Sequence, residues 1–140
     1  MMLEPSSAIT AGAVFLTVIA VAYGGTFMLR VVTGKQGTNA LQKSFFRAGH
    51  AHAGVLIILG LLVTLFVDAA SAGVWGRVAA DGVLACAILI PAGFFFSAMG
   101  RDPQKPNRLV ALIWIGFGVL TAALPTAGIA LIVAGASALG

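Results

Sequence analysis

Residues 48–67 read AGHAHAGVLIILGLLVTLFV, twenty positions without an Asp, Glu, Lys or Arg. A helix needs about 20 mostly apolar residues to cross the hydrocarbon core of a bilayer. Three further stretches meet this requirement: residues 7–29, residues 78–99 with a single charge at Asp81, and residues 109–138. The sequence therefore predicts an all-α fold, a polytopic membrane protein built as a four-transmembrane-helix bundle.

The composition agrees with lipid as the surrounding solvent. Hydrophobic residues make up 60% of the 140 residues and charged residues 9%, whereas soluble domains carry about 25% charged residues. The spans are apolar on every side instead of alternating with a period of two, which argues against a transmembrane β-barrel. We expect a single membrane domain over residues 1–140, with helices at about 7–30, 45–70, 76–99 and 108–138.

The basic residues are distributed unevenly between the two sides of the predicted membrane domain. The connections after the first and third spans share one side and hold seven of the eight basic residues: Arg30, Lys35, Lys43, Arg47, Arg101, Lys105 and Arg108. Basic connections mark the cytoplasmic side. We therefore expect a multi-pass protein of the bacterial plasma membrane, with both termini on the non-cytoplasmic side. The seven side chains are expected to contact lipid headgroups, and nucleic acid is not an expected partner.

The first basic connection contains a predicted helix start. Thr38 or Asn39 is expected to cap a short interfacial helix that runs straight into the second membrane-spanning helix, because these residue types cap helix N-termini. In the segment that follows, Gln42 and Lys43 would face water. Three apolar side chains would enter the membrane interface: Leu41, Phe45 and Phe46.

Small residues recur at three- and four-residue steps along two of the spans. They are Thr10, Ala13, Thr17, Ala20 and Gly24 in the first span, and Ala123, Ala127, Ala130 and Ala134 in the last. In lipid, small residues let helix backbones approach closely, so these stripes are predicted to be packing seams. The surface that remains favours a homo-oligomer or a larger membrane complex.

The two histidines, His50 and His52, lie just inside the membrane from the first basic connection. In a regular helix, side chains two positions apart point in nearly opposite directions, so both can bind one metal ion only where the backbone is irregular. An imidazole can change its charge in the physiological pH range. The histidines are therefore candidates for metal ligands and, with Asp81, Tyr23 and Thr17, for an ion or proton path.

An aromatic belt is the alternative interpretation of this region. Tyr23, Phe94, Phe95 and Trp114 are predicted to reach a depth similar to that of the histidines. Amphipathic rings commonly lie at the level of the lipid headgroups. On this interpretation the rings anchor the protein in the membrane and carry no chemistry.

Asp81 is a carboxylate inside an apolar span, where ionised groups are energetically unfavourable. Arg77 precedes it by one helical turn, and Asp68 lies at the outer end of the preceding span. One interpretation is an outer charge cluster of these three residues that holds two helix ends together. The other makes Asp81 the outer end of the ion or proton path.

Three functions are compatible with these residues. The first is a small channel or an ion- or proton-linked transporter that acts as an oligomer, with the histidines as its inner gate. The second is an accessory subunit of a larger membrane complex. The third is a redox subunit that holds a b-type haem or copper through His50 or His52. With four acidic residues and no arrangement suited to nucleophilic catalysis, the sequence argues against an enzyme.

Two segments carry a resemblance. The stretches FFRAGHAHAG (residues 45–54) and PAGFFFSAMGRDPQ (residues 91–104) are similar to those of a group of small four-span integral membrane proteins of actinobacteria. The resemblance implies a four-span membrane fold and assigns no role to any residue.

Overall fold

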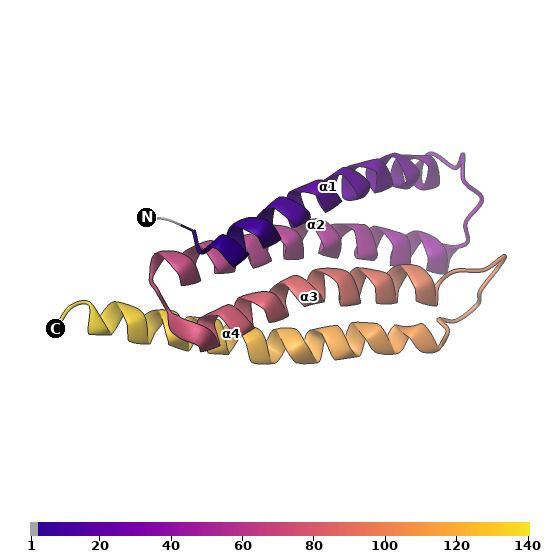
Figure 1. Ribbon diagram of the computed structural model, residues 1–140. Coiled ribbons are helices and arrows are strands. Elements are labelled where there is room, and N and C mark those ends of the chain that lie inside the picture. The colour runs from indigo at the N-terminus through magenta and orange to yellow at the C-terminus, as the bar shows by residue number, and fades with distance from the viewer. Residues whose placement is uncertain (1–2) are drawn as a thin grey trace.

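The computed structural model describes residues 3–140, which form four long α-helices: α1 (Pro5–Val32), α2 (Ala40–Ala69), α3 (Gly73–Ser97) and α4 (Ala111–Ser137). A short 3₁₀ helix, η1 (Arg108–Val110), leads into α4. Successive helices run in opposite directions, so the two chain ends lie at the same end of the bundle (Figure 1). We call this the terminal end; it includes residues 70–72. Residues 33–39 and 98–107 form the opposite end, which we call the basic end.

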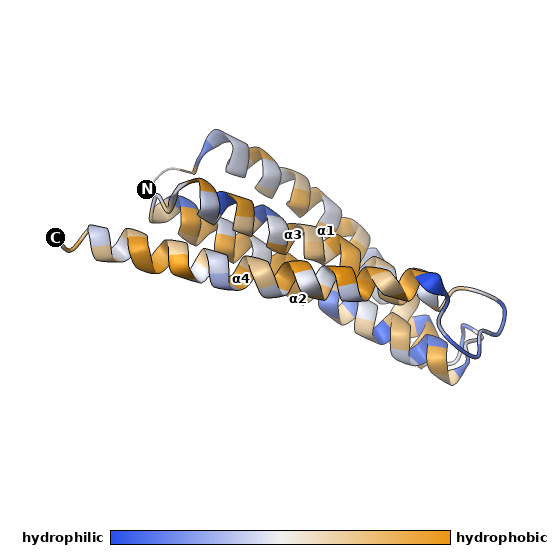
Figure 2. Cartoon of the chain, turned by 90° about the horizontal axis from the view of Figure 1, so that it is seen from below, coloured by the Kyte–Doolittle hydropathy of each residue, from blue (hydrophilic) through white to orange (hydrophobic). Residues whose placement is uncertain are grey.

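All four long helices are long and apolar enough to cross a membrane. Apolar residues cover most of the helical surface, whereas hydrophilic residues gather in the connections of the basic end (Figure 2). The expected basic residues of this end are all exposed. The prediction of a multi-pass, all-helical membrane protein is confirmed.

The start of α2 confirms one prediction and overturns another. Asn39 caps the helix: its side chain accepts the backbone N–H of Gln42 at 2.9 Å, and the Gln42 side chain accepts the backbone N–H of Asn39 at 3.1 Å. The prediction that Gln42 faces water is wrong, because its side chain is only 5% exposed. Its amide donates to the carbonyl oxygens of Ala98 at 3.2 Å and Gly100 at 2.9 Å. Gln42 therefore joins α2 to the end of α3.

The core lies along the α2–α3 and α3–α4 interfaces, and glycines make these interfaces close. The Leu84 side chain occupies the space beside Gly60, and Ile113 lies directly against Gly93. A buried cluster of Leu56, Cys86 and Ile90 fills the middle. Close approach of this kind replaces the hydrophobic effect as the source of helix association in lipid.

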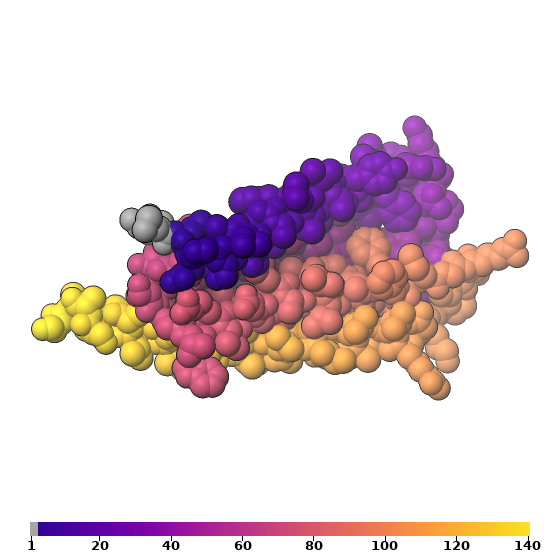
Figure 3. Space-filling view, in the orientation of Figure 1, coloured from indigo at the N-terminus to yellow at the C-terminus, as the bar shows by residue number. Residues whose placement is uncertain are grey.

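Helix α1 is attached differently. Its backbone comes close only to that of α2 within the described chain, and it forms one edge of the molecule while α4 forms the opposite edge (Figure 3). At the basic end, Met28 and Val31 of α1 pack with Phe46 and Ala98. The last turns of α4 extend beyond the other helices at the terminal end (Figures 1 and 3).

The two predicted seams have different outcomes. In α4, Ala123 and Ala127 are buried as expected, and Ala123 faces Gly82 of α3. In α1, the prediction is wrong for Ala13, Thr17 and Ala20, which are exposed. Thr10 and Gly24 of the same stripe do lie toward α2. Small residues thus identified only part of the face that meets α2, because α1 is apolar all round.

Candidate functional site

A polar hollow opens at the terminal end between α1, α2 and α3. Its volume is about 90 Å³, and it is lined by Ser6, Ser7 and Thr10 of α1, Thr64, Val67 and Asp68 of α2, and Arg77, Ala80 and Asp81 of α3. Within each helix, the polar residues lie three or four positions apart. The polar residues of one helix therefore share one face of that helix. A space of this volume can hold several water molecules or a small cation.

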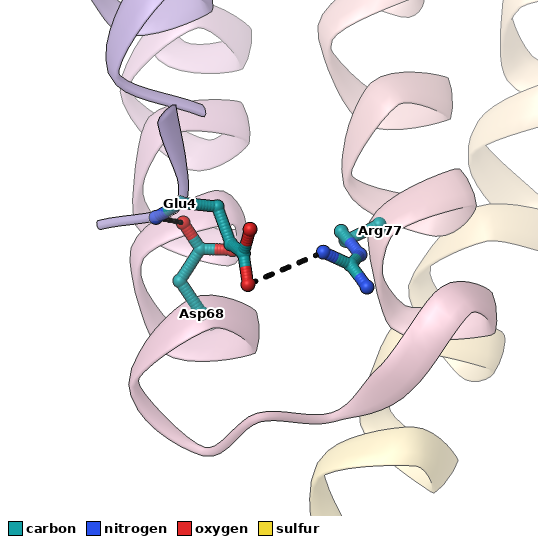
Figure 4. A network of polar contacts seen from close by, with 3 residues as sticks. All are labelled: Glu4, Asp68 and Arg77. Carbon is teal, nitrogen blue, oxygen red and sulfur yellow. Dashed lines mark hydrogen bonds and ion pairs between the residues drawn. The ribbon is translucent and has the colours of Figure 1, made fainter. Parts of the chain in front are cut away.

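An ion pair at the mouth of the hollow fixes the beginning of α1. Arg77 Nη1 lies 3.5 Å from Glu4 Oε1, and the backbone N–H of Glu4 donates to Asp68 Oδ2 at 3.1 Å (Figure 4). Glu4 directly precedes α1, and Pro5 occupies the first helical turn, where proline is favoured. The three helices are thus joined by one acidic residue that lies outside the predicted spans.

The expected outer charge cluster is corrected by this network. Asp68, Arg77 and Asp81 do line one hollow, but in residues 3–140 the ion pair of Arg77 is made with Glu4. Sequence reasoning missed Glu4, together with Ser6, Ser7 and Thr10. The available signal was the spacing of the three hydroxyl residues on one face of α1, directly after the first acidic residue of the chain.

Asp81 is the carboxylate of the hollow that has no partner. It is exposed, and its side chain makes no hydrogen bond or ion pair within residues 3–140. It lies eight residues after the start of α3, which is about 12 Å along the helix axis. A carboxylate at this depth can exchange a proton or bind a cation, since the nearest arginine already pairs with Glu4.

The hollow is closed toward the basic end. Two of its lining residues, Ser7 and Thr64, are buried, and the Thr64 hydroxyl donates to the carbonyl oxygen of Gly60 at 2.9 Å. One turn below Thr64, Leu84 fills the α2–α3 interface at Gly60. The α2–α3 interface below the hollow is therefore apolar and closely packed.

The two histidines contact different helices, as their spacing predicts. A methyl group added to Gly24 or Gly25 of α1 would lie 3.7 Å from the His50 ring, so His50 sits against this glycine pair. His52 faces the other way: its ring centroid lies 5.2 Å from that of Phe94 and 6.0 Å from that of Phe117. Its Nδ1 is 2.8 Å from the Ala48 carbonyl oxygen, to which it donates in the tautomer protonated at that atom.

This arrangement limits the proposed metal or haem site. Because α2 is a continuous helix through both histidines, a centre that uses both imidazoles must recruit them from different chains. Residues 3–140 contain no group of three or more His, Cys, Asp or Glu side chains placed to hold a metal ion.

The remaining path candidates lie away from the hollow. Tyr23 is 77% exposed on the outer side of α1, and the exposed Thr17 hydroxyl donates to the Val14 carbonyl oxygen. A path that joins these two residues to Asp81 inside one chain is therefore not formed. Trp114 also faces outward, whereas Phe94 packs edge-on against Phe45 at the α2–α3 interface.

Comparison with known proteins identifies no relative: no protein-family model, curated protein or solved structure matches this chain.

Proposed function

We propose that this protein is a small membrane transport component for protons or small cations, and that Asp81 is the group that takes up the transported ion from the terminal end. The observation that carries the proposal is an unpaired carboxylate that lies within a membrane-spanning helix and opens into a polar hollow. Ionised groups in such positions are unfavourable and characteristically mark ion pathways or proton relays.

The surroundings of Asp81 suit a small cation. The Glu4 carboxylate balances the charge of Arg77, which leaves the negative charge of Asp81 available. Hydroxyl oxygens from Ser7, Thr10 and Thr64 line the same hollow. Oxygen ligands of this kind are preferred by hard cations, and a chain of hydroxyl groups and water can also conduct a proton.

The α1–α2 interface is the route that we propose from the hollow to the basic end. The hollow lies between these helices at one end of their interface, and His50 lies between them near the other end, against Gly24 and Gly25. The α2–α3 interface is filled by Leu84 and the apolar core. His50, and not His52, is therefore the proposed inner group, and ion passage requires α1 to move or a second chain to complete the path.

Flux measurements in proteoliposomes test this proposal. Purified protein is reconstituted with an internal pH dye, and uptake is driven by a pH gradient or by a sodium or potassium gradient. Asp81→Asn keeps the size of the side chain and removes its charge, so flux should fall to the level of protein-free liposomes. His50→Gln should reduce flux, because it removes the titratable group from the α1–α2 interface.

Two variants serve as matched controls. His52→Gln changes the histidine that faces Phe94 and Phe117, and Asp102→Asn changes a carboxylate in the basic-end connection; both should retain flux. Wild-type flux in Asp81→Asn, or an equal loss in His50→Gln and His52→Gln, would contradict the proposed route.

We further propose a location in a bacterial plasma membrane, with the basic end in the cytoplasm. The support is the concentration of seven basic residues toward the basic end and the positive-inside rule. Lys35→Cys and Ser71→Cys, treated with a membrane-impermeant thiol reagent in intact cells, test this orientation. Only the Ser71→Cys protein should react, since the native Cys86 is fully buried.

An accessory subunit is the second candidate function. The observation that favours it is the exposed apolar surface of α1, which includes Ile9, Leu16 and Ile19. A partner membrane protein could cover this surface. Co-purification of a large complex from native membranes, with loss of that complex in Leu16→Trp, would favour this function over independent transport.

A further inference from the structure

Two shallow grooves meet at Arg47, on the exposed side of α2 near the basic end. They share Arg47 and Ala51. The first groove is completed by Ala40, Lys43, Ser44 and Ala48. The second lies along the α1–α2 interface and is completed by Gly25, Met28, Leu29, Val32 and His50.

The first groove has the groups that recognise a phosphate. Lys43, Ser44 and Arg47 lie within about one turn of α2, and all three are exposed. In residues 3–140, Lys43 and Arg47 form no ion pair, and the Ser44 hydroxyl forms no hydrogen bond. A guanidinium, an ammonium and a hydroxyl group together provide donors for several phosphate oxygens.

The second groove has the shape and chemistry that suit a hydrocarbon chain. It runs from Val32, the last residue of α1, to Gly25, seven residues or about 10 Å along the helix axis. Met28 and Leu29 provide apolar walls. The absence of a side chain at Gly25 keeps the deep end of the groove open beside His50.

We propose that these grooves form a specific site for one anionic glycerophospholipid of the leaflet at the basic end. The phosphate binds Lys43, Ser44 and Arg47, and one acyl chain follows α1 toward Gly25. A soluble phosphate would use only the first groove, whereas a lipid uses both at once because the grooves join at Arg47 and Ala51. Clusters of basic residues near the cytoplasmic ends of membrane helices are typical sites for anionic headgroups. The proposal does not require the transport function, although the second groove and the proposed ion route share His50.

Native mass spectrometry of the detergent-purified protein tests the site. The protein is titrated with phosphatidylglycerol, with phosphatidylcholine, and with inorganic phosphate. One phosphatidylglycerol should bind more tightly than the others. The Lys43→Gln/Arg47→Gln protein should lose this preference, with a decrease in affinity of about 25-fold if each basic residue contributes about 1 kcal/mol.

Blocking the grooves separates a site from general surface charge. Ala51 lines both grooves, so Ala51→Trp should abolish tight phosphatidylglycerol binding without changing the net charge. Val55 lies one turn further along α2, outside both grooves, and is 64% exposed. Val55→Trp should therefore bind phosphatidylglycerol as the wild type does.

Removal of charge elsewhere provides the second control. Arg101→Gln/Lys105→Gln removes two positive charges from the other basic connection and should leave the tight binding unchanged. The proposal is overturned if this variant loses as much affinity as Lys43→Gln/Arg47→Gln, if Ala51→Trp binds normally, or if inorganic phosphate competes fully with the lipid.

Discussion

Helices α2, α3 and α4 form a closely packed layer, whereas α1 is held mainly at its ends. A methyl group added to Gly93 of α3 would lie 2.8 Å from the backbone nitrogen of Ile113, and one added to Gly116 of α4 would lie 2.5 Å from Ile90 Cγ1. In α1, a methyl group at Gly12 would meet no atom of residues 3–140 within 4 Å, and one at Gly24 would meet only the His50 ring of that range, at 3.7 Å. The same residue type is thus essential for packing in one region and replaceable in the other.

The difference reflects what drives helix association in a membrane. Lipid tails are as apolar as leucine side chains, so burial alone does not attract one helix to another. Close packing and polar contacts hold helices together instead. The α2–α3–α4 layer is closely packed along its length. Helix α1 has close apolar contacts near the basic end and polar contacts at Glu4. Such an attachment allows α1 to move without disrupting the other helices.

The largest effect is expected for Gly93→Ala. The added methyl group meets the backbone of Ile113, which cannot rotate away as a flexible side chain can. We expect the free energy of unfolding to fall by about 3 kcal/mol, the upper end of typical overpacking effects. Unfolding of the detergent-solubilised protein in increasing mole fractions of sodium dodecyl sulfate, followed by circular dichroism, measures this change.

Two glycines of α4 provide the matched control for that experiment. Gly116→Ala should also destabilise the protein, because it overlaps Ile90, whereas Gly118→Ala should not, because no atom lies within 4 Å of the added group. Equal unfolding curves for Gly116→Ala and Gly118→Ala would show that close glycine contacts do not hold the layer together.

An intermediate effect is expected for Gln42→Met. The substitution keeps the approximate volume and removes the donors to the carbonyl oxygens of Ala98 and Gly100. It also removes the acceptor for the backbone N–H of Asn39. Leaving buried polar groups unpaired should lower the free energy of unfolding by about 2 kcal/mol. Gln104→Met is the control, since Gln104 is exposed and, among the described residues, its side chain bonds only to the nearby Asp102 carbonyl oxygen.

The smallest effect on stability is expected for Arg77→Gln. The Arg77–Glu4 pair is about half exposed, and exposed pairs contribute at most about 1 kcal/mol. Hydrogen exchange should nevertheless be more sensitive: amides in residues 5–12 should exchange faster, while those of α3 and α4 remain unchanged. Arg101→Gln should leave the exchange of residues 5–12 at the wild-type rate. Faster exchange throughout the protein would contradict the separate attachment of α1.

Sequence patterns predicted the elements of this fold better than their packing. Runs of about 20 apolar residues identified all four spans, and Asn39 identified the start of α2 because capping is a local interaction. Gln42 was assigned to the wrong environment, since its partners at Ala98 and Gly100 are 56 and 58 residues away. The face that α1 presents to α2 was identified only in part, at Thr10 and Gly24, because a helix that is apolar all round has no pattern that distinguishes lipid from protein.

The candidate site was predictable only in part. Asp68, Arg77 and Asp81 were identified because charges are rare in apolar spans, and the structure places them around one hollow. Glu4 was not identified from the sequence, because its role depends on where the first turn of α1 meets the ends of α2 and α3. Similarly, the spacing of His50 and His52 predicted that they would face apart, but the glycine pair opposite His50 becomes visible only in three dimensions.

The attachment of Glu4 also has a consequence for the order of synthesis. Its backbone N–H bonds to a carboxylate 64 residues later in the chain, which a ribosome adds about 3–13 s afterwards at 5–20 residues per second. During that interval the beginning of α1 must remain without this partner. The hydroxyl groups of Thr17, Thr26 and Thr33 bond to carbonyl oxygens within α1 itself. Helix α1 can thus persist before these partners are made, and its terminal end can be joined only after Asp68 and Arg77 have been added.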